Sequence, residues 1–238
     1  MKLDLLKEAT AATASGGSAA LATNLKSGLQ TLVQGFEKKG TLSLGSETIS
    51  AIETAIRDDR STTVATPDGP IFIEVFNPPL RCMIVGAVHI AQPLAQMAAL
   101  AGYAVTIIDP RSAFASETRF PDVALSTEWP DDAMATLRPD RRTAVVTLTH
   151  DPKIDDPALT AALRSGAFYI GALGSRKTHA SRCQRLTDAG FTPDDLGRIH
   201  GPVGLNIGAL SPAEIAVSIL GQITSVLRVE RLKGREAA

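Results

Sequence analysis

The residues with the clearest chemical potential form a glycine turn after an apolar run. Arg81–Val85 is predicted to be a buried strand, and a helical pattern then runs through Ala101. The first backbone N–H groups of a helix lack internal partners and its dipole is positive at that end, so both favour a bound phosphate. We therefore expect a phosphate-bearing ligand to bind the turn formed by Gly86, Ala87, Val88, His89 and Ile90.

The spacing of this turn resembles the G-x-G-x-x-G/A pattern of dinucleotide-binding proteins. Gly86 and Ala91 occupy the first and last positions, but Val88 stands where the second glycine would be. That glycine normally lets the backbone approach a pyrophosphate closely. A branched side chain there is expected to lie where the ligand would bind, and it disfavours a positive φ. The turn thus predicts a Rossmann-type fold more strongly than a dinucleotide.

An acidic residue follows at the end of the next apolar run. Asp109 lies about twenty residues beyond the turn, where an acid can accept a hydrogen bond from a ribose 2′-hydroxyl. The alternative is that Asp109 and Pro110 simply open a turn. Arg111, two residues on, could bind a phosphate or face water.

A second glycine turn also lies between a predicted strand and a predicted helix. It runs from Gly171 through Gly174 and Ser175 to Arg176 and Lys177. Ser175 is a good N-cap residue. Cations at the positive end of a helix oppose its dipole, so a bound anion would explain them better than helix stability would. The alternative is a tight turn with solvated charges.

The third candidate segment is Thr149-His150-Asp151, which follows an apolar run over 144–148. His150 could act as an acid–base group or hydrogen-bond within a turn. No partner for a catalytic triad, no G-x-S-x-G nucleophile motif and no metal-ligand spacing is present in the sequence. A binding protein is therefore favoured over a catalyst.

Strands and helices that alternate along the chain must position these turns. Apolar runs at 81–85, 105–108, 123–125, 144–148 and 168–170 are expected to be strands, with helical patterns between and after them. Continuous apolar strands alternating with helices indicate a parallel sheet covered on both faces. The fold class is α/β, with a Rossmann-like parallel sheet domain over 77–238.

The first 76 residues have a different pattern, in which helical stretches near both Leu3 and Ile52 flank short β-leaning runs. Asp68-Gly69 between two such runs indicates a hairpin. Residues 1–76 are therefore expected to form a small α+β unit that ends where Asn77-Pro78-Pro79 stiffens the chain.

The composition is that of an ordinary globular protein, with 44% hydrophobic and 21% charged residues and a formal net charge of −1. This balance favours neither nucleic acid nor a membrane surface as a partner. No apolar run is long enough to span a membrane, and the N-terminus lacks the apolar segment of a signal peptide. Two cysteines cannot make a disulfide framework. We expect a soluble cytoplasmic protein.

Four segments resemble those of the XdhC/CoxI family, the accessory proteins of xanthine dehydrogenase and related molybdenum hydroxylases. They are GAVHIAQPLA, THD, YIGALGSRKT and GPVGLNIGALSPAEIAVSI, at 86–95, 149–151, 169–178 and 201–219. The resemblance implies a dimeric protein that binds the molybdenum cofactor (molybdopterin) as cargo. It also implies that a cysteine desulfurase sulfurates this cargo and that a xanthine dehydrogenase-type hydroxylase receives it.

The sequence differs from the family pattern at two places. The family has glycine where this chain has Val88, and it carries a G-G-C-x-E stretch whose nearest counterpart here, at residues 40–47, has no cysteine. Two other functions therefore compete with the cofactor chaperone. One is a Rossmann-type NAD(P)-binding oxidoreductase, and the other is a non-binding scaffold for partner proteins.

Overall fold

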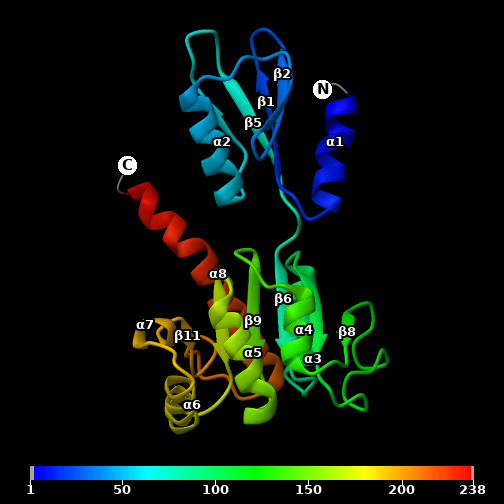
Figure 1. Ribbon diagram of the computed structural model, residues 1–238, viewed down its shortest axis with the longest axis vertical. Coiled ribbons are helices and arrows are strands. Elements are labelled where there is room, and N and C mark those ends of the chain that lie inside the picture. Colours follow the sequence, from blue (N-terminus) through cyan, green and yellow to red (C-terminus); the bar gives the residue numbers. More distant parts are fainter. Residues whose placement is uncertain (1–2, 237–238) are drawn as a thin grey trace. The chain divides into compact units, whose positions relative to one another are not determined.

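The computed structural model describes the backbone of residues 3–236 and the side chains of residues 3–228. The chain forms two compact units, Met1–Pro78 and Pro79–Ala238 (Figure 1). Each unit has its own sheet and its own apolar core. None of the described helices is both long and apolar enough to cross a membrane.

The first unit is an antiparallel sheet covered by one helix on each face. Its strands, in the spatial order β3-β2-β1-β5-β4, are β1 (Ala19–Asn24), β2 (Gln30–Gln34), β3 (Glu37–Gly40), β4 (Thr62–Val64) and β5 (Ile71–Phe76). The helices are α1 (Leu3–Ala14) and α2 (Ser46–Asp58). Alternate residues of β1 serve the two faces: Leu21 packs with α1, whereas Ala22 packs with α2.

The second unit is a parallel sheet of six strands in the order β11-β10-β9-β6-β7-β8. The strands are β6 (Arg81–Val85), β7 (Ala104–Ile108), β8 (Ala124–Ser126), β9 (Thr143–Thr147), β10 (Tyr169–Ala172) and β11 (Ile199–His200). The helices are α3 (Ala91–Leu100), α4 (Pro130–Leu137), α5 (Pro152–Arg164), α6 (Arg176–Asp188), α7 (Pro193–Leu196) and α8 (Pro212–Glu236).

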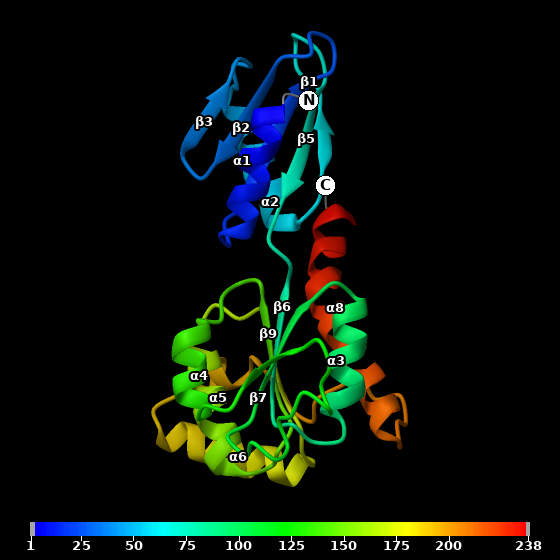
Figure 2. The ribbon, with the colours of Figure 1, turned by 90° about the vertical axis from the view of Figure 1, so that its right-hand side faces the viewer.

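Helices cover both faces of this parallel sheet. α3 and α8 pack on one face, and α4, α5 and α6 pack on the other (Figure 2). Successive residues of β6 alternate between the two cores, with Ile84 in the first and Met83 in the second. This two-sided burial explains why the strands are continuously apolar in sequence. The prediction of a Rossmann-like parallel sheet is confirmed.

The bounds of two helices and one strand add detail. The helix after the first glycine turn begins at Ala91, so residues 87–90 form a separate turn. α5 begins at Pro152, because Asp151 caps it and Pro157 is tolerated within the helix. The strand β3 was missed because all four of its residues are exposed and none is apolar, so only backbone pairing with β2 defines it.

Candidate functional site

The candidate site lies at the carboxyl edge of the parallel sheet, where the strand order reverses. β6 and β9 are neighbours there, although β7 and β8 separate them in sequence and lie on the other side of β6. Parallel α/β sheets bind ligands at this reversal point. Gly86 follows β6, Thr149 and His150 follow β9, and Gly174 follows β10, so all three predicted segments converge on one edge.

The two glycine turns flank the Thr149–His150 turn directly. A Cβ atom added to Gly86 would overlap the Thr149 methyl group, and φ of Gly86 is +105°. A Cβ atom added to Gly174 would lie 3.6 Å from His150 Nδ1 and 3.1 Å from the Thr178 side chain. Both glycines are therefore required by close approach as well as by positive φ. The two turns therefore lie on either side of the Thr149–His150 turn.

The first turn presents a run of free amides. Within residues 3–236, the backbone N–H groups of Val88, His89 and Ile90 have no acceptor. The preceding residue, Ala87, is held by both of its backbone groups: its N–H donates to Asp109 Oδ2 (2.8 Å), and its carbonyl accepts from Arg119 Nη1 (2.7 Å). Unpartnered amides on a rigid turn are the donors that a phosphate requires.

The structure corrects the expectation for Val88. Its side chain packs against the core on the α3 and α8 face, and its φ is not positive. The branched side chain is therefore directed toward the core, and replacing it with glycine would relieve no backbone strain. Ile90 packs in the same way, whereas His89 is exposed.

Asp109 does not offer the free carboxylate that the ribose interpretation requires. Its side chain is 0% exposed, and its two oxygens accept from the Ala87 amide and from the backbone and guanidinium of Arg111 (2.7–3.0 Å). Burial would raise the pKa of Asp109, but these hydrogen bonds outweigh it and hold the pKa below its usual value. Asp109 positions the first turn in this structure, which argues against the ribose interpretation of this residue.

Arg111 lies beside the first turn with its charge paired. Its guanidinium makes two bonds to the Asp109 carboxylate and lies 4.7 Å from the ring centre of Phe114. The neighbouring Arg119 also lies over Phe114, at 5.9 Å, and donates to its carbonyl. Segment 109–120 thus braces the glycine turn through two arginines, of which Arg119 was not predicted from the sequence.

The second turn presents free amides and free cations together. Ser175 caps α6, as predicted, by accepting from the Thr178 N–H (3.1 Å). Among the described residues, the N–H groups of Gly174, Ser175, Arg176 and Lys177 have no acceptor, and the side chains of Arg176 and Lys177 have no partner. Both cations are exposed. An anion at this helix end would meet backbone donors and two positive charges.

Gly171 has a different role from the one predicted. It lies within β10 and is buried, and a Cβ atom there would lie 2.6 Å from Val203 Cγ2 and 2.8 Å from the Tyr169 ring. Its small size lets strand, loop and ring pack together. Gly171 is therefore a core residue of β10 and lies outside the second turn.

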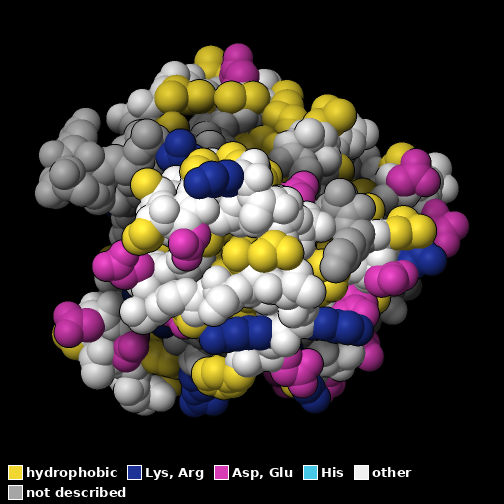
Figure 3. Space-filling model, turned by 90° about the horizontal axis from the view of Figure 1, so that it is seen from above, with side chains coloured by type: hydrophobic (Ala, Val, Ile, Leu, Met, Phe, Trp, Pro, Cys, Tyr) yellow, Lys and Arg dark blue, Asp and Glu magenta, His cyan; other side chains and the backbone are white. Residues whose placement is uncertain are grey.

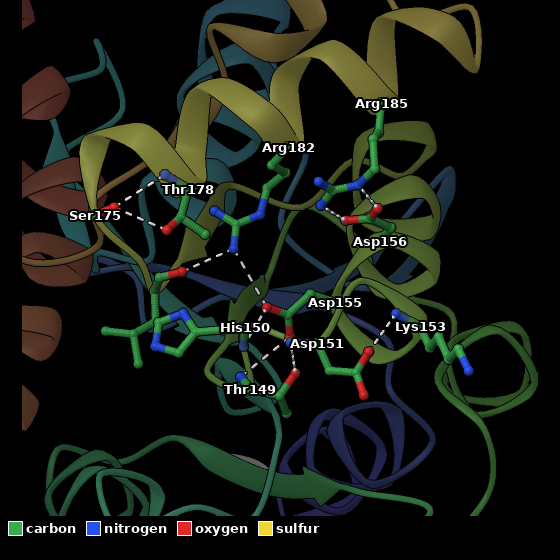
Figure 4. A network of polar contacts seen from close by, with 11 residues as sticks. Thr149, His150, Asp151, Lys153, Asp155, Asp156, Ser175, Thr178, Arg182 and Arg185 are labelled. Atoms are coloured by element: carbon green, nitrogen blue, oxygen red, sulfur yellow. Dashed lines mark hydrogen bonds and ion pairs between the residues drawn. The ribbon is translucent and has the colours of Figure 1, made fainter.

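A buried carboxylate holds the Thr149–His150 turn from below (Figure 4). Asp155, which is 1% exposed, accepts from the Thr149 hydroxyl (2.6 Å) and from the backbone N–H groups of Thr149 (3.3 Å) and His150 (3.0 Å). Burial raises the pKa of Asp155, and these bonds together with the charge of Arg182 offset only part of that effect. The turn places exposed His150 at φ +64°.

Asp155 and Arg182 were missed by sequence reasoning. An aspartate in the first turn of a helix and an arginine in mid-helix are ordinary surface residues in sequence, and only packing of α5 against α6 buries them. Nothing in the local pattern distinguishes them from the neighbouring pair Asp156–Arg185, which is much more exposed.

On the face that Figure 3 shows, charge of one sign is not concentrated over the described residues. Basic and acidic side chains are interspersed with apolar ones over the face in Figure 3. Among the described residues, no group of three His, Cys, Asp or Glu side chains is close enough to hold a metal ion. His150 has no hydrogen-bonded side-chain partner in residues 3–228, so the site consists chiefly of backbone donors, positive charge and a histidine.

A family model described as the XdhC Rossmann domain matches residues 82–223, which is more than half of the chain. The chain belongs to the XdhC family. The match spans both glycine turns, the Thr149–His150 turn and the loop before α8. The resemblance noted from the four sequence segments is thereby confirmed.

Named proteins similar to this XdhC-family chain include the molybdenum cofactor insertion chaperone PaoD of Escherichia coli (strain K12). It is 35% identical over 151 residues, which cover 63% of this chain and 41% of PaoD. A protein of Bacillus subtilis (strain 168) that is named as a probable xanthine dehydrogenase component is 33% identical over 154 residues, covering 64% of this chain and 44% of that protein. The chain therefore spans less than half the length of these relatives.

A solved structure is similar over nearly the whole chain. The crystal structure of a xanthine dehydrogenase from Bacillus halodurans superposes with a TM-score of 0.75 at 25% identity, covering 97% of this chain and 68% of that one. The likeness therefore includes the first unit, which the family model does not match.

Proposed function

We propose that this XdhC-family protein binds the molybdenum cofactor as cargo at the carboxyl edge of its parallel sheet. The observation that carries the proposal is the adjacency of two turns with free amides, at Val88–Ile90 and Gly174–Lys177. Molybdopterin is a phosphate-bearing, partly nucleotide-like anion, and such a ligand suits two helix-terminal turns. PaoD, a similar protein, is named as an insertion chaperone for this cofactor.

A chaperone role agrees with the chemistry of the site. A carrier must hold its cargo and release it, so it needs differential affinity between two states and no acid–base group. Within residues 3–228 the exposed His150 lacks the hydrogen-bonded side-chain partner that a general base usually has. We infer that the protein does not transform the cofactor itself.

The direct test is to purify the protein from a host that makes molybdenum cofactor and to identify the molybdopterin that copurifies. We expect roughly stoichiometric pterin and its loss on Gly174→Ala, which removes space at the second turn. Arg141→Ala is the control because Arg141 precedes β9 at the opposite edge of the sheet. Binding no tighter than that of an unrelated acidic protein would contradict the proposal.

We further propose that the cargo is sulfurated by a cysteine desulfurase and delivered to a xanthine dehydrogenase-type molybdenum hydroxylase, with the protein acting as a homodimer. The names of relatives support delivery to such a hydroxylase. The desulfurase and the homodimer follow from the family resemblance of the sequence. Co-expression with such a hydroxylase should raise its activity, and sedimentation should give twice the monomer mass. Unchanged hydroxylase activity would argue against delivery.

An NAD(P)-binding oxidoreductase is the second candidate, because the strand order and the reversal point are those of dinucleotide-binding sheets. The engaged carboxylate of Asp109 argues against it. Saturation at 100 times the dissociation constant should stabilise a binding protein by ~2.7 kcal/mol. We expect no thermal shift with millimolar NAD(H) or NADP(H), and a clear shift would favour this function instead.

A further inference from the structure

A buried arginine connects the two sides of the candidate site. Arg182, on α6, is 1% exposed, and its Nη2 donates both to the Leu173 carbonyl (2.9 Å) and to Asp155 Oδ2 (3.4 Å). Its Nε and Nη1 are buried and have no acceptor among the described residues. A guanidinium with unused buried donors is costly for stability, so its position calls for a reason other than folding.

The geometry of α6 explains how this side chain reaches the turn. Arg182 lies four residues after Thr178 and seven after Ser175, on the same face of the helix, and helical side chains lean toward the N-terminus. Figure 4 shows the guanidinium between α6 and the chain that enters it, above Asp155. One positive charge therefore sits directly behind the second glycine turn.

The contacts of this pair polarise two peptide groups in opposite directions. The Leu173 carbonyl that accepts from Arg182 belongs to the same peptide as the Gly174 N–H, which has no acceptor among the described residues. A charged donor on the oxygen strengthens the N–H at the other end as a donor. Conversely, Asp155 accepts from the His150 N–H, which strengthens the Thr149 carbonyl of that peptide as an acceptor.

We propose that Asp155 and Arg182 are the positioning pair of the ligand site and set its polarity. The Gly174 N–H then donates to an anionic oxygen of the ligand. The Thr149 carbonyl accepts from a hydrogen-bond donor of the same ligand. The site accordingly selects phosphate-bearing molecules with an N–H or ammonium group near the phosphate. This inference rests on the proposed function, because it assumes that the cargo binds between the two turns.

The test compares two small probes, phosphoethanolamine and ethyl phosphate, by isothermal titration. They share a phosphate on a two-carbon chain, and only the first has a donor at the other end. The native protein should bind phosphoethanolamine several-fold more tightly. In the double variant Asp155→Asn/Arg182→Met, which removes both buried charges at little change of volume, phosphate affinity should fall about tenfold and the preference should disappear.

The matched control is Asp156→Asn/Arg185→Met. Asp156 and Arg185 form an ion pair between the same two helices (2.5 and 3.0 Å) but are far more exposed and do not contact either turn. Its affinity and preference should equal those of the native protein. The Gly174 amide proton should resonate further upfield in the buried-pair variant of the free protein and remain unchanged in the control.

Each outcome is decisive. A folded Asp155→Asn/Arg182→Met variant with native affinity and preference would overturn the positioning role and leave the proposed function intact. Failure of the native protein to bind either probe, or equal affinity for the two, would overturn the proposed selectivity, whereas only the absence of copurified molybdopterin would overturn the proposed function. If the double variant does not fold, Arg182→Gln replaces it: its amide can still donate to the Leu173 carbonyl but carries no charge. Native affinity and native preference in that variant would likewise overturn the proposal.

Discussion

The two glycine turns of the second unit perform similar tasks by different means. In the first turn, the side chains of Asp109 and Arg119 hold the N–H and the carbonyl of Ala87, and apolar Val88 and Ile90 tie the turn to the core. In the second, a serine cap leaves exposed cations at the helix end and a buried guanidinium behind them. The first turn thus holds its backbone amides in fixed positions, whereas the second turn concentrates positive charge.

The largest expected effect on stability is at Gly86, which has less room for a side chain than Gly174 has. Gly86→Ala should lower the free energy of unfolding by about 2–5 kcal/mol, since positive φ and overlap with Thr149 add together. Gly174→Ala should cost about 1–3 kcal/mol, because Thr178 can move. Gly102→Ala, at φ +87° with open space, is the control at about 1 kcal/mol. Urea unfolding measures all three, and equal losses at Gly86 and Gly102 would contradict the close-packing argument.

The next effect concerns the clamp on the first turn. Asp109→Asn removes charged hydrogen bonds to a buried group and should cost about 2–3 kcal/mol at neutral pH. The pKa of Asp109 is lower in the folded chain than its ordinary 3.8, so its contribution is complete above pH 3.8 and is lost as the pH falls through the folded pKa. The difference between native protein and variant should therefore shrink only in strong acid. A difference that declines near pH 6 would show that another group carries it.

A smaller effect is expected where the sequence departs from the family pattern. Val88→Gly should lower stability by about 1–2 kcal/mol through lost apolar contact and added chain entropy. Pyrophosphate affinity should change less than threefold, because the valine side chain packs toward the core. A large gain in affinity on this substitution would show that Val88 obstructs the site after all.

The smallest effect on stability should come from the second turn's cations. Arg176→Ala/Lys177→Ala should change the free energy of unfolding by less than about 0.5 kcal/mol, because both side chains are exposed and unpaired in the described part of the chain. Pyrophosphate affinity should nevertheless fall about tenfold at low salt and less at high salt. Loss of stability without loss of affinity would make these residues structural and remove the contrast between the turns.

Much of the candidate site was predictable because its signals are local. Glycines at strand ends, the Ser175 cap and the position of the Thr149–His150 turn all follow from short-range patterns. The roles of Gly171 and Asp109 were not predictable in this way. Gly171 is small because Tyr169 and Val203 pack over it, and Asp109 is engaged because Arg111 folds back onto it.

By itself, the sequence determined where most strands of the second unit lie and that they form a parallel sheet, since burial on both faces imposes continuous apolar runs on the chain. Only the tertiary structure decided that Asp155 and Arg182 lie in the interior, beneath the site, while Asp156 and Arg185 lie far nearer the surface. The reason is physical: a side chain's partners depend on which helix face meets its neighbour, and no short stretch of sequence records that contact.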